Sequence, residues 1–527
     1  MMAKDNSSLP KSKINYKLIV GVLGLVLILV AAILVNSMAN KDTSSVLTGA
    51  ISIDNGDQEI NWNRYPTTDV ELTDTYEITK SGTYHVTGTL EDGKITINAK
   101  NEVVKLILDN VTISNSAGPA ISCLEAEDLV IELVGENTLE DGANYANETD
   151  EDITGTIYSK ADLTIEGSGG LNITGNFQDG IVSKDDLKIK SGTYVIDAAD
   201  DGIRGKDSVY IVDGNFTISS AADSIKSTNE IDAGKGFVLI EKGNFNLISA
   251  AKGIKAFNTV LIYDGIFDIN SYDDSIHSDN YIGITNGQIN IDSGDDGIHA
   301  NSKIIIDGGE INIDKAYEGI EAQAILINDG KITVKSTDDG VNAGGGADSS
   351  ATNRKGAGAF DADEDCVITI NGGQIYVNAS SDGIDSNGYV YFNGGRTVVD
   401  GPTNNGNGAL DAGAGVNISG GDVIAVGASG MAVSFNKNSS VYNLSIYLAS
   451  VQAAETKIEI KNSQDEVVVS HTSAKTFSHM TIGSEKLYPG ENYTIYLNDQ
   501  KYQEFVISDI TTTIGNSNNN FNNNFRR

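Results

Sequence analysis

Residues 274–317 read DSIHSDNYIGITNGQINIDSGD and then DGIHANSKIIIDGGEINIDKAY, two units of 22 residues that match position by position. Each unit opens with an acidic residue, then Gly or Ser, then Ile. This phrase recurs, with Val for Ile in one unit and Lys252 for the acid in another. The first residue of the phrase stands at 179, 201, 223, 252, 274, 296, 318, 339 and 382, in steps of 22, 22, 29, 22, 22, 22, 21 and 43. The period is therefore 22 residues, interrupted by insertions.

Inside a unit the apolar residues alternate, as in Ile304 and Ile306, then Gly308-Gly309, then Ile311 and Ile313. Such alternation is typical of short strands with one buried face, and Gly marks the corners. A closed coil of three short strands needs about this many residues, and stacked coils would lie about 4.8 Å apart. We therefore predict an all-β chain whose body is a right-handed parallel β-helix with about 22 residues per coil.

The composition changes along the chain and divides it into five expected segments. These are a cytoplasmic N-terminus with a signal anchor or signal peptide (1–40), a lead-in and N-terminal cap (41–93), the β-helix (94–430), a small C-terminal β-sandwich-like domain (431–513) and an Asn-rich disordered tail (514–527).

The segment from Leu18 to Val35 is one uncharged apolar run, preceded by four lysines and one aspartate. Positive charge on that side predicts a cytoplasmic N-terminus and an exported body. The length of the run favours an uncleaved membrane anchor over a cleaved signal. We expect the body on the extracellular face of the cell membrane, either anchored or secreted.

Lys and Arg number 36 against 73 Asp and Glu, a formal net charge of −37. This charge would repel a phosphate backbone, so we expect no nucleic-acid partner. Cys123 and Cys366 are about nine coils apart, too far for a disulfide, so both are predicted to be unpaired core residues. We expect a monomeric body.

Stacking would align the repeated acids into columns, and carboxylates about 4.8 Å apart repel one another. Calcium would compensate, because a Ca–O distance of about 2.4 Å from each side spans one coil spacing. The alternative is that each Asp merely shapes its turn. The candidate calcium ligands from the columns are Asp201, Asp223, Asp273, Asp274, Asp295, Asp296, Glu318, Asp338, Asp339 and Asp382.

Two positions past each Gly runs a further column that grades from basic to acidic: Val182, Arg204, Lys226, Lys255, His277, His299, Glu321, Asn342 and Asp385. An acidic polysaccharide would contact its basic half directly and its acidic half through calcium. The candidate carbohydrate-binding residues are Arg204, Lys226, Lys255, His277 and His299. The alternative is that Arg204 and Lys226 pair with acids of the chain itself. His277 and His299 are expected to be solvated rather than zinc ligands.

Four longer phrases, IYSKADLTIEGSGGL (157–171), DDGIRGKDSVYI (200–211), SDGIDSNG (381–388) and GPTNNGNGALD (401–411), resemble the bacterial carbohydrate-binding, polysaccharide-lyase-like β-helix family. The resemblance covers roughly residues 70 to 510. It implies an exported β-helix that holds calcium and binds cellulose-like or polygalacturonate-like chains. It also implies that Asp382, Asp385 and Asp411 are calcium or sugar ligands. Lys252 departs from the pattern and puts a calcium site at its coil in doubt.

Three functions remain open at this point. The first is a calcium-dependent polysaccharide-binding protein without catalysis, which we favour. The second is a calcium-dependent lyase in which Arg204, Lys226 or Lys255 removes a proton. The third is a structural surface protein stabilised by calcium. Tyr272 and Tyr317 fall in different columns, so the sequence predicts no aligned track of tyrosines for stacking on sugars.

Overall fold

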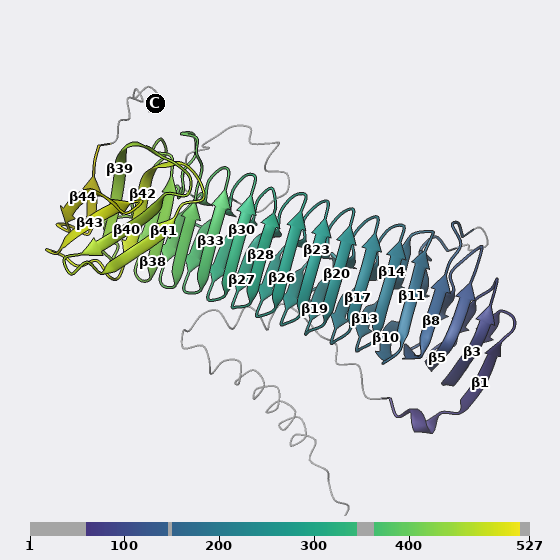
Figure 1. Ribbon diagram of the computed structural model, residues 1–527. Coiled ribbons are helices and arrows are strands. Elements are labelled where there is room, and N and C mark those ends of the chain that lie inside the picture. Colours follow the sequence, from purple (N-terminus) through teal and green to yellow (C-terminus); the bar gives the residue numbers. More distant parts are fainter. Residues whose placement is uncertain (1–59, 146–149, 345–362, 517–527) are drawn as a thin grey trace, which may run out of the picture. The chain divides into compact units, whose positions relative to one another are not determined.

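The computed structural model describes residues 60–145, 150–344 and 363–516 (Figure 1). The predicted membrane segment at 18–35 and residues 517–527 of the predicted tail lie outside these ranges. Among the described residues no helix has the length and apolar character needed to span a bilayer. A short 3₁₀ helix, η1 (Trp62–Arg64), precedes the first strand.

The chain coils into a parallel β-solenoid, and all but the terminal coils contribute a strand to each of three sheets, which we call the short, middle and long sheets. In the described residues the middle sheet has fifteen strands, one per coil. They are β1 (Thr67–Leu72), β3 (Gly82–Leu90), β5 (Val103–Ser114), β7 (Asp128–Val134), β10 (Asp162–Gly167), β13 (Asp186–Ile189), β16 (Ser208–Ile211), β19 (Phe237–Ile240), β22 (Thr259–Ile262), β25 (Tyr281–Ile284), β27 (Ile298–Ile306), β29 (Ile320–Ile327), β32 (Val367–Ile370), β35 (Tyr389–Phe392) and β37 (Gly415–Ile418).

The short sheet precedes the middle sheet in each coil, and β27 and β29 run through both. Its other strands are β2 (Tyr76–Ile78), β4 (Ile95–Asn98), β6 (Ile121–Glu125), β9 (Gly155–Ser159), β12 (Asp179–Ser183), β15 (Ile203–Gly205), β18 (Ile225–Ser227), β21 (Ile254–Ala256), β24 (Ile276–Ser278), β31 (Val341–Ala343) and β34 (Ile384–Ser386).

The long sheet completes each coil. It begins with the second parts of β3 and β5 and continues through β8 (Glu136–Glu140), β11 (Gly170–Gly175), β14 (Thr193–Ala198), β17 (Asn215–Ser220), β20 (Asn244–Ser249), β23 (Ile266–Ser271), β26 (Gln288–Ser293), β28 (Glu310–Lys315), β30 (Lys331–Ser336), β33 (Gln374–Ala379), β36 (Arg396–Asp400) and β38 (Asp422–Gly427).

The predicted stacking is confirmed. Ile276 pairs with Ile298 and His277 with His299, so residues 22 apart lie on adjacent coils. Paired strands already begin at β1, within the range expected to be lead-in. The right hand predicted for the coil stays a prediction.

Identical positions of successive coils also stack in the interior. The rings of Tyr194, Phe216, Phe245 and Phe267 lie parallel, with centroids 4.8, 4.9 and 4.6 Å apart. Cys123 and Cys366 are buried and unpaired, as predicted. The core is thus a set of ladders of like residues along the coil axis.

At the far end, two sheets enclose a second apolar core that includes Leu444, Ile460 and Met480. One sheet extends the solenoid, because β42 (Phe477–Ser484) pairs antiparallel with both β38 and β39 (Asn443–Gln452), and β45 (Thr511–Ile514) joins β39. The other has the order β41 (Val467–Thr472), β40 (Lys457–Asn462), β43 (Asn492–Leu497) and β44 (Gln500–Val506). This unit covers the strand edge that the last coil would otherwise expose.

Besides the strand pairing, a buried carboxylate ties this end unit to the solenoid. Asp400, at the end of β36, accepts hydrogen bonds from Tyr376 Oη at 2.8 Å and Ser473 Oγ at 3.1 Å, and lies 2.8 Å from His471 Nε2. Burial raises the pKa of Asp400, but His471 and Tyr376 outweigh it and the net pKa lies below the usual value. The carboxylate is therefore charged and fully partnered.

Candidate functional site

The acidic column consists of Asp179, Asp201, Asp223, Lys252, Asp274, Asp296, Glu318, Asp339 and Asp382, at the corner between the long and short sheets. Seven of its carboxylates use one oxygen to accept the backbone N–H of the next coil, at 2.5 to 3.1 Å. This contact satisfies a buried donor at the turn. One carboxylate oxygen of each of these acids therefore stabilises the turn, as the alternative interpretation predicted. The second oxygen is left to contact other side chains.

The partner column, defined as Val182, Arg204, Lys226, Lys255, His277, His299, Glu321, Asn342 and Asp385, runs beside the acidic column on the short sheet. In its basic half Arg204 lies 2.8 Å from Asp179, and Lys226 lies 3.2 Å from Asp201 and 2.9 Å from Asp223. These pairs are the intramolecular alternative left open by the sequence. Asp201 and Asp223 are neutralised by the chain itself.

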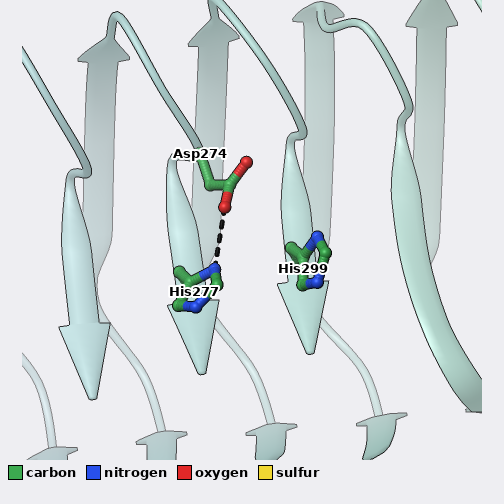
Figure 2. A group of neighbouring side chains, drawn as sticks. All are labelled: Asp274, His277 and His299. Carbon is green, nitrogen blue, oxygen red and sulfur yellow. Dashed lines mark hydrogen bonds and ion pairs between the residues drawn. The ribbon is translucent and has the colours of Figure 1, made fainter. Parts of the chain in front are cut away.

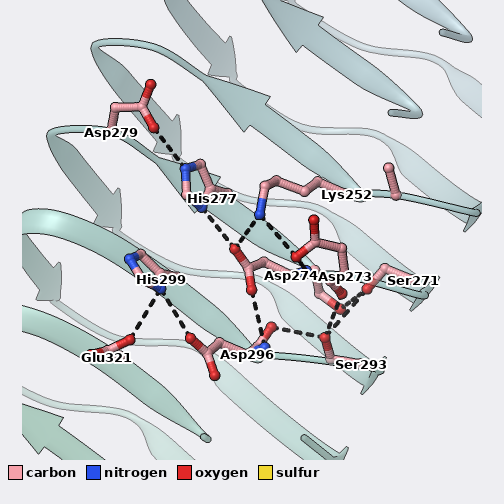
Figure 3. Close-up of polar contacts among 12 residues, drawn as sticks. Lys252, Ser271, Asp273, Asp274, His277, Asp279, Ser293, Asp296, His299 and Glu321 are labelled. Carbon is pink, nitrogen blue, oxygen red and sulfur yellow. Dashed lines mark hydrogen bonds and ion pairs between the residues drawn. The ribbon is translucent and has the colours of Figure 1, made fainter. Parts of the chain in front are cut away.

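Lys252 neutralises the next acids (Figure 3). Its Nζ lies 2.5 Å from Asp274 Oδ2 and 3.0 Å from Asp273 Oδ1. Burial raises the pKa of Asp274, but His277 and Lys252 overcome it and hold the pKa well below its usual range. Asp273, Asp274 and Asp295 each place an oxygen within 4.8 Å of the others, so the predicted convergence of the paired acids is real. The ammonium of Lys252 serves two of these three carboxylates.

His277 and His299 occupy adjacent short strands, β24 and β27 (Figure 2). The expectation that they are solvated is wrong, since their exposed fractions are 2% and 0%. His277 Nδ1 lies 2.8 Å from Asp274, and His299 Nδ1 lies 2.9 Å from Asp296 and 3.2 Å from Glu321. Burial lowers the pKa of His299, but these two carboxylates raise it to about 12. The buried His299 ring thus belongs to the ladder of polar contacts through Asp296 and Glu321.

Beyond His299 the partner column holds Glu321, Asn342 and Asp385, and no basic residue. Burial, with Glu321 and Asp296 nearby, raises the pKa of Glu318 to about 9. Asn342 Nδ2 donates to Glu318 at 2.8 Å, while its buried Oδ1 has no hydrogen-bond partner among the residues that the structure describes. An oxygen that is buried without a donor is costly unless a cation or a water meets it.

Clustered acids with raised pKa values continue to the last coils. Burial, with Asp339, Asp385 and Asp411 nearby, raises the pKa of Asp382 to about 8. Asp411 lies one coil beyond Asp385, because its backbone N–H donates to Ile384 and Leu410 bridges to Ile384. We call Glu318, Glu321, Asn342, Asp339, Asp382, Asp385 and Asp411 the acidic end. Its oxygen-only donor set suits calcium.

A surface pocket of about 380 Å³ lies over the basic start of the partner column. Arg204, Lys184 and Lys206 line it, together with Thr154 and Asp152. Arg204 Nη2 donates to Thr154 Oγ1 at 2.7 Å, and Lys184 lies 3.2 Å from Asp152. Of the predicted carbohydrate-binding residues, only Arg204 lines this pocket, whereas Lys226 and Lys255 follow it on the next two coils.

Sequence reasoning missed a second acidic column at the corner before the middle sheet. Asp128 pairs with Asp162, and Asp186 lies on the next coil. Burial, with Asp185 nearby, raises the pKa of Asp162 to about 7, and Lys235 pairs with Asp186 at 2.7 Å. The signal was the recurring Asp-Leu pair at 128, 162 and 186, which opens each of these strands.

Residues 73–319 match the family model described as carbohydrate-binding domain-containing protein. A relative of the same description from Acetivibrio thermocellus is 38% identical over 127 residues, which are 23% of this chain and 44% of the relative, so the match spans less than half of the relative's length. A solved structure described as the polysaccharide lyase-like protein from C. thermocellum, gadolinium derivative, is 29% identical, with a TM-score of 0.38, and covers 46% of this chain and 95% of its own. The family match confirms the predicted resemblance for residues 73–319, which include the first two phrases that carried it; the phrases at 381–388 and 401–411 lie outside the matched range.

Proposed function

Because residues 73–319 match a carbohydrate-binding family, we propose that the protein binds extended acidic polysaccharide, of the polygalacturonate kind, in a calcium-dependent manner. The observation that carries the proposal is the pocket at Arg204, Lys184 and Lys206. Three cations line this pocket beside two carboxylates, Glu151 and Asp152, on a chain whose net charge is −37. The site is placed outside the cell in this proposal, in keeping with the apolar run at 18–35.

The cations of the pocket can exchange partners with an incoming carboxylate. Lys184 is 31% exposed and its partner Asp152 64%, while Lys206 is 49% exposed and lies 3.8 Å from Asp207. Exposed pairs of this kind contribute only about 0 to 1 kcal/mol each. A uronate carboxylate can therefore replace Asp152 and Asp207 at small cost. Thr154 and Ser183 add hydroxyl groups for sugar oxygens.

Calcium is proposed at the acidic end. Neighbouring carboxylates at one coil spacing repel by about 3.5 kcal/mol per pair at an effective dielectric of 20. Burial and this repulsion raise the pKa of Glu318 to about 9 and that of Asp382 to about 8. Both carboxyl groups therefore favour their protonated form unless a cation compensates the charge. A calcium ion would displace those protons and also meet Asn342 Oδ1. An anionic chain leaving the basic pocket along the partner column would then meet calcium.

Binding is favoured over lyase chemistry by the state of two of the three candidate bases, Lys226 and Arg204. A lyase base must give up its own proton first. Burial lowers the pKa of Lys226, but Asp201 and Asp223 outweigh it and the net pKa is raised. Arg204 keeps its proton at any ordinary pH. Neither residue is prepared to remove a proton from a sugar.

Affinity electrophoresis of the full chain in gels containing polygalacturonate tests the proposal. We expect strong retardation with calcium, and much weaker retardation with chelator. Replacing Lys184 and Lys206 together by Ala should weaken binding about tenfold or more. Lys242→Ala is the matched control, because Lys242, at the turn between β19 and β20, is an exposed lysine that pairs with Asp213. Equal retardation of all variants, or none for the wild type, would overturn the proposed site.

A further inference from the structure

Two tyrosines stand out at the corner between the long and short sheets. Tyr272 follows β23 and is 80% exposed, and Tyr317 follows β28 and is 43% exposed. Neither takes part in either apolar core. Exposing a large aromatic ring to water is unfavourable in free energy, and a ligand that covers the ring would remove that unfavourable exposure.

The backbone register places the two tyrosines two coils apart. Gly294 N–H donates to Ser271 at 2.9 Å, and Tyr317 N–H donates to Asp295 at 2.7 Å. Ser271 pairs with Ser293, so the residues that follow them, Tyr272 and Gly294, occupy the same position on adjacent coils. Tyr317 occupies the position of Asp295 on the coil after that. The columns of Tyr272 and Tyr317 are adjacent, and two coils separate their backbones by about 9.6 Å along the axis. This distance is close to the length of a disaccharide unit in an extended chain.

The coil between them carries Gly294 in the column of Tyr272 and Asp295 in the column of Tyr317. A Cβ at Gly294 would lie 2.0 Å from the backbone oxygen of Tyr272, so only glycine fits there. The Tyr317 hydroxyl is hydrogen-bonded to Asp338, which holds its ring. The position next to Tyr272 on the following coil therefore has no side chain, and the position next to Tyr317 on that coil holds the acceptor Asp295.

We propose that Tyr272 and Tyr317 form a second carbohydrate subsite, which takes a neutral extended glycan with a pyranose ring against each tyrosine. The inference rests on the proposed carbohydrate-binding function. It assigns acidic glycans to the pocket at Arg204 and neutral glycans to the two tyrosines. Asp273, Asp295 and Asp338 surround the pair, so a uronate would be repelled here. Sugar hydroxyls, in contrast, can donate hydrogen bonds to these carboxylates. The stacking face and the acceptors together select a neutral chain.

The test is calorimetry of the full chain with a neutral β-1,4-linked hexasaccharide, beside electrophoresis in polygalacturonate. Tyr272→Ala with Tyr317→Ala should weaken binding of the neutral chain about tenfold, from the loss of two ring contacts. Tyr272→Phe with Tyr317→Phe keeps the rings and should retain most of the affinity. Tyr488→Ala, a 55% exposed tyrosine in the end unit, is the control and should change nothing.

Three outcomes overturn the inference: no binding of the neutral chain by the wild type, full affinity in the double Ala variant, or equal losses in the Ala and control variants. Retained binding of polygalacturonate in the double Ala variant supports two separate sites. If polygalacturonate binding persists while the neutral chain never binds, the subsite fails and the proposed function stands. If neither glycan binds, both fail.

Discussion

Replacing Lys252 by Met should expose how strongly the ionic ladder holds its coils together. Lys252 is the one base in the acidic column, and its side chain is only 7% exposed. Methionine keeps much of the apolar stem and removes the ammonium. The change leaves Asp274, whose side chain is 0% exposed, with His277 as its remaining cation at 2.8 Å.

The size of the effect follows from that arrangement. Removing one member of a buried ion pair costs about 3 to 5 kcal/mol, because the other charge stays buried. His277 still compensates Asp274, so we expect the lower end, about 3 kcal/mol. A solenoid opens locally, so this loss concerns the neighbouring coils rather than the whole chain. At 1.4 kcal/mol per tenfold, amide hydrogen exchange around residues 274–278 and 296–300 should accelerate about a hundredfold.

Hydrogen exchange followed by mass spectrometry measures this directly, with Lys242→Met as the control. Lys242 lies 2.9 Å from Asp213, but the two side chains are 60% and 46% exposed, so its loss should cost less than about 1 kcal/mol. Equal exchange rates in the two variants would refute the reasoning, since the buried pair would then be worth no more than a surface pair.

Three further predictions concern other parts of the chain. Without calcium the melting temperature should fall as the pH rises from about 5 to 9. The reason is that the raised pKa values of Glu318 and Asp382 let the folded state keep protons that the unfolded chain releases above about pH 4. Saturating calcium should remove this pH dependence, and a flat profile in chelator would contradict the prediction. Asp400→Asn should cost about 2 to 4 kcal/mol and speed protease cleavage near Ser473, because it removes the charge that His471 faces; unchanged cleavage would contradict the role of this tie. Phe245→Ala should cost about 3 to 5 kcal/mol in urea unfolding and Phe245→Leu clearly less, because Ala leaves a cavity between two stacked rings; equal losses would speak against the ladder.

The fold was open to prediction because a coil is a local unit. Once Asp274 and Asp296 were seen to open matching phrases, alternation and glycine corners sufficed to place them on adjacent coils. Both cysteines, likewise, could be predicted to be unpaired from their spacing and to lie in the core from the alternation they share with neighbouring Ile. The tie between Asp400 and His471 could not be predicted, because 71 residues separate them and no repeat relates them.

The sequence by itself determined the period, the columns and the order of charges along each column, because stacking turns spacing along the chain into position in space. Only the tertiary structure decided what those charges do. Whether a carboxylate meets a lysine, an imidazolium or another acid depends on side-chain reach and burial, which spacing does not contain. Thus Asp274 lies within an internal ion pair, whereas Glu318 has none among the described residues, although both occupy the same place in the repeat.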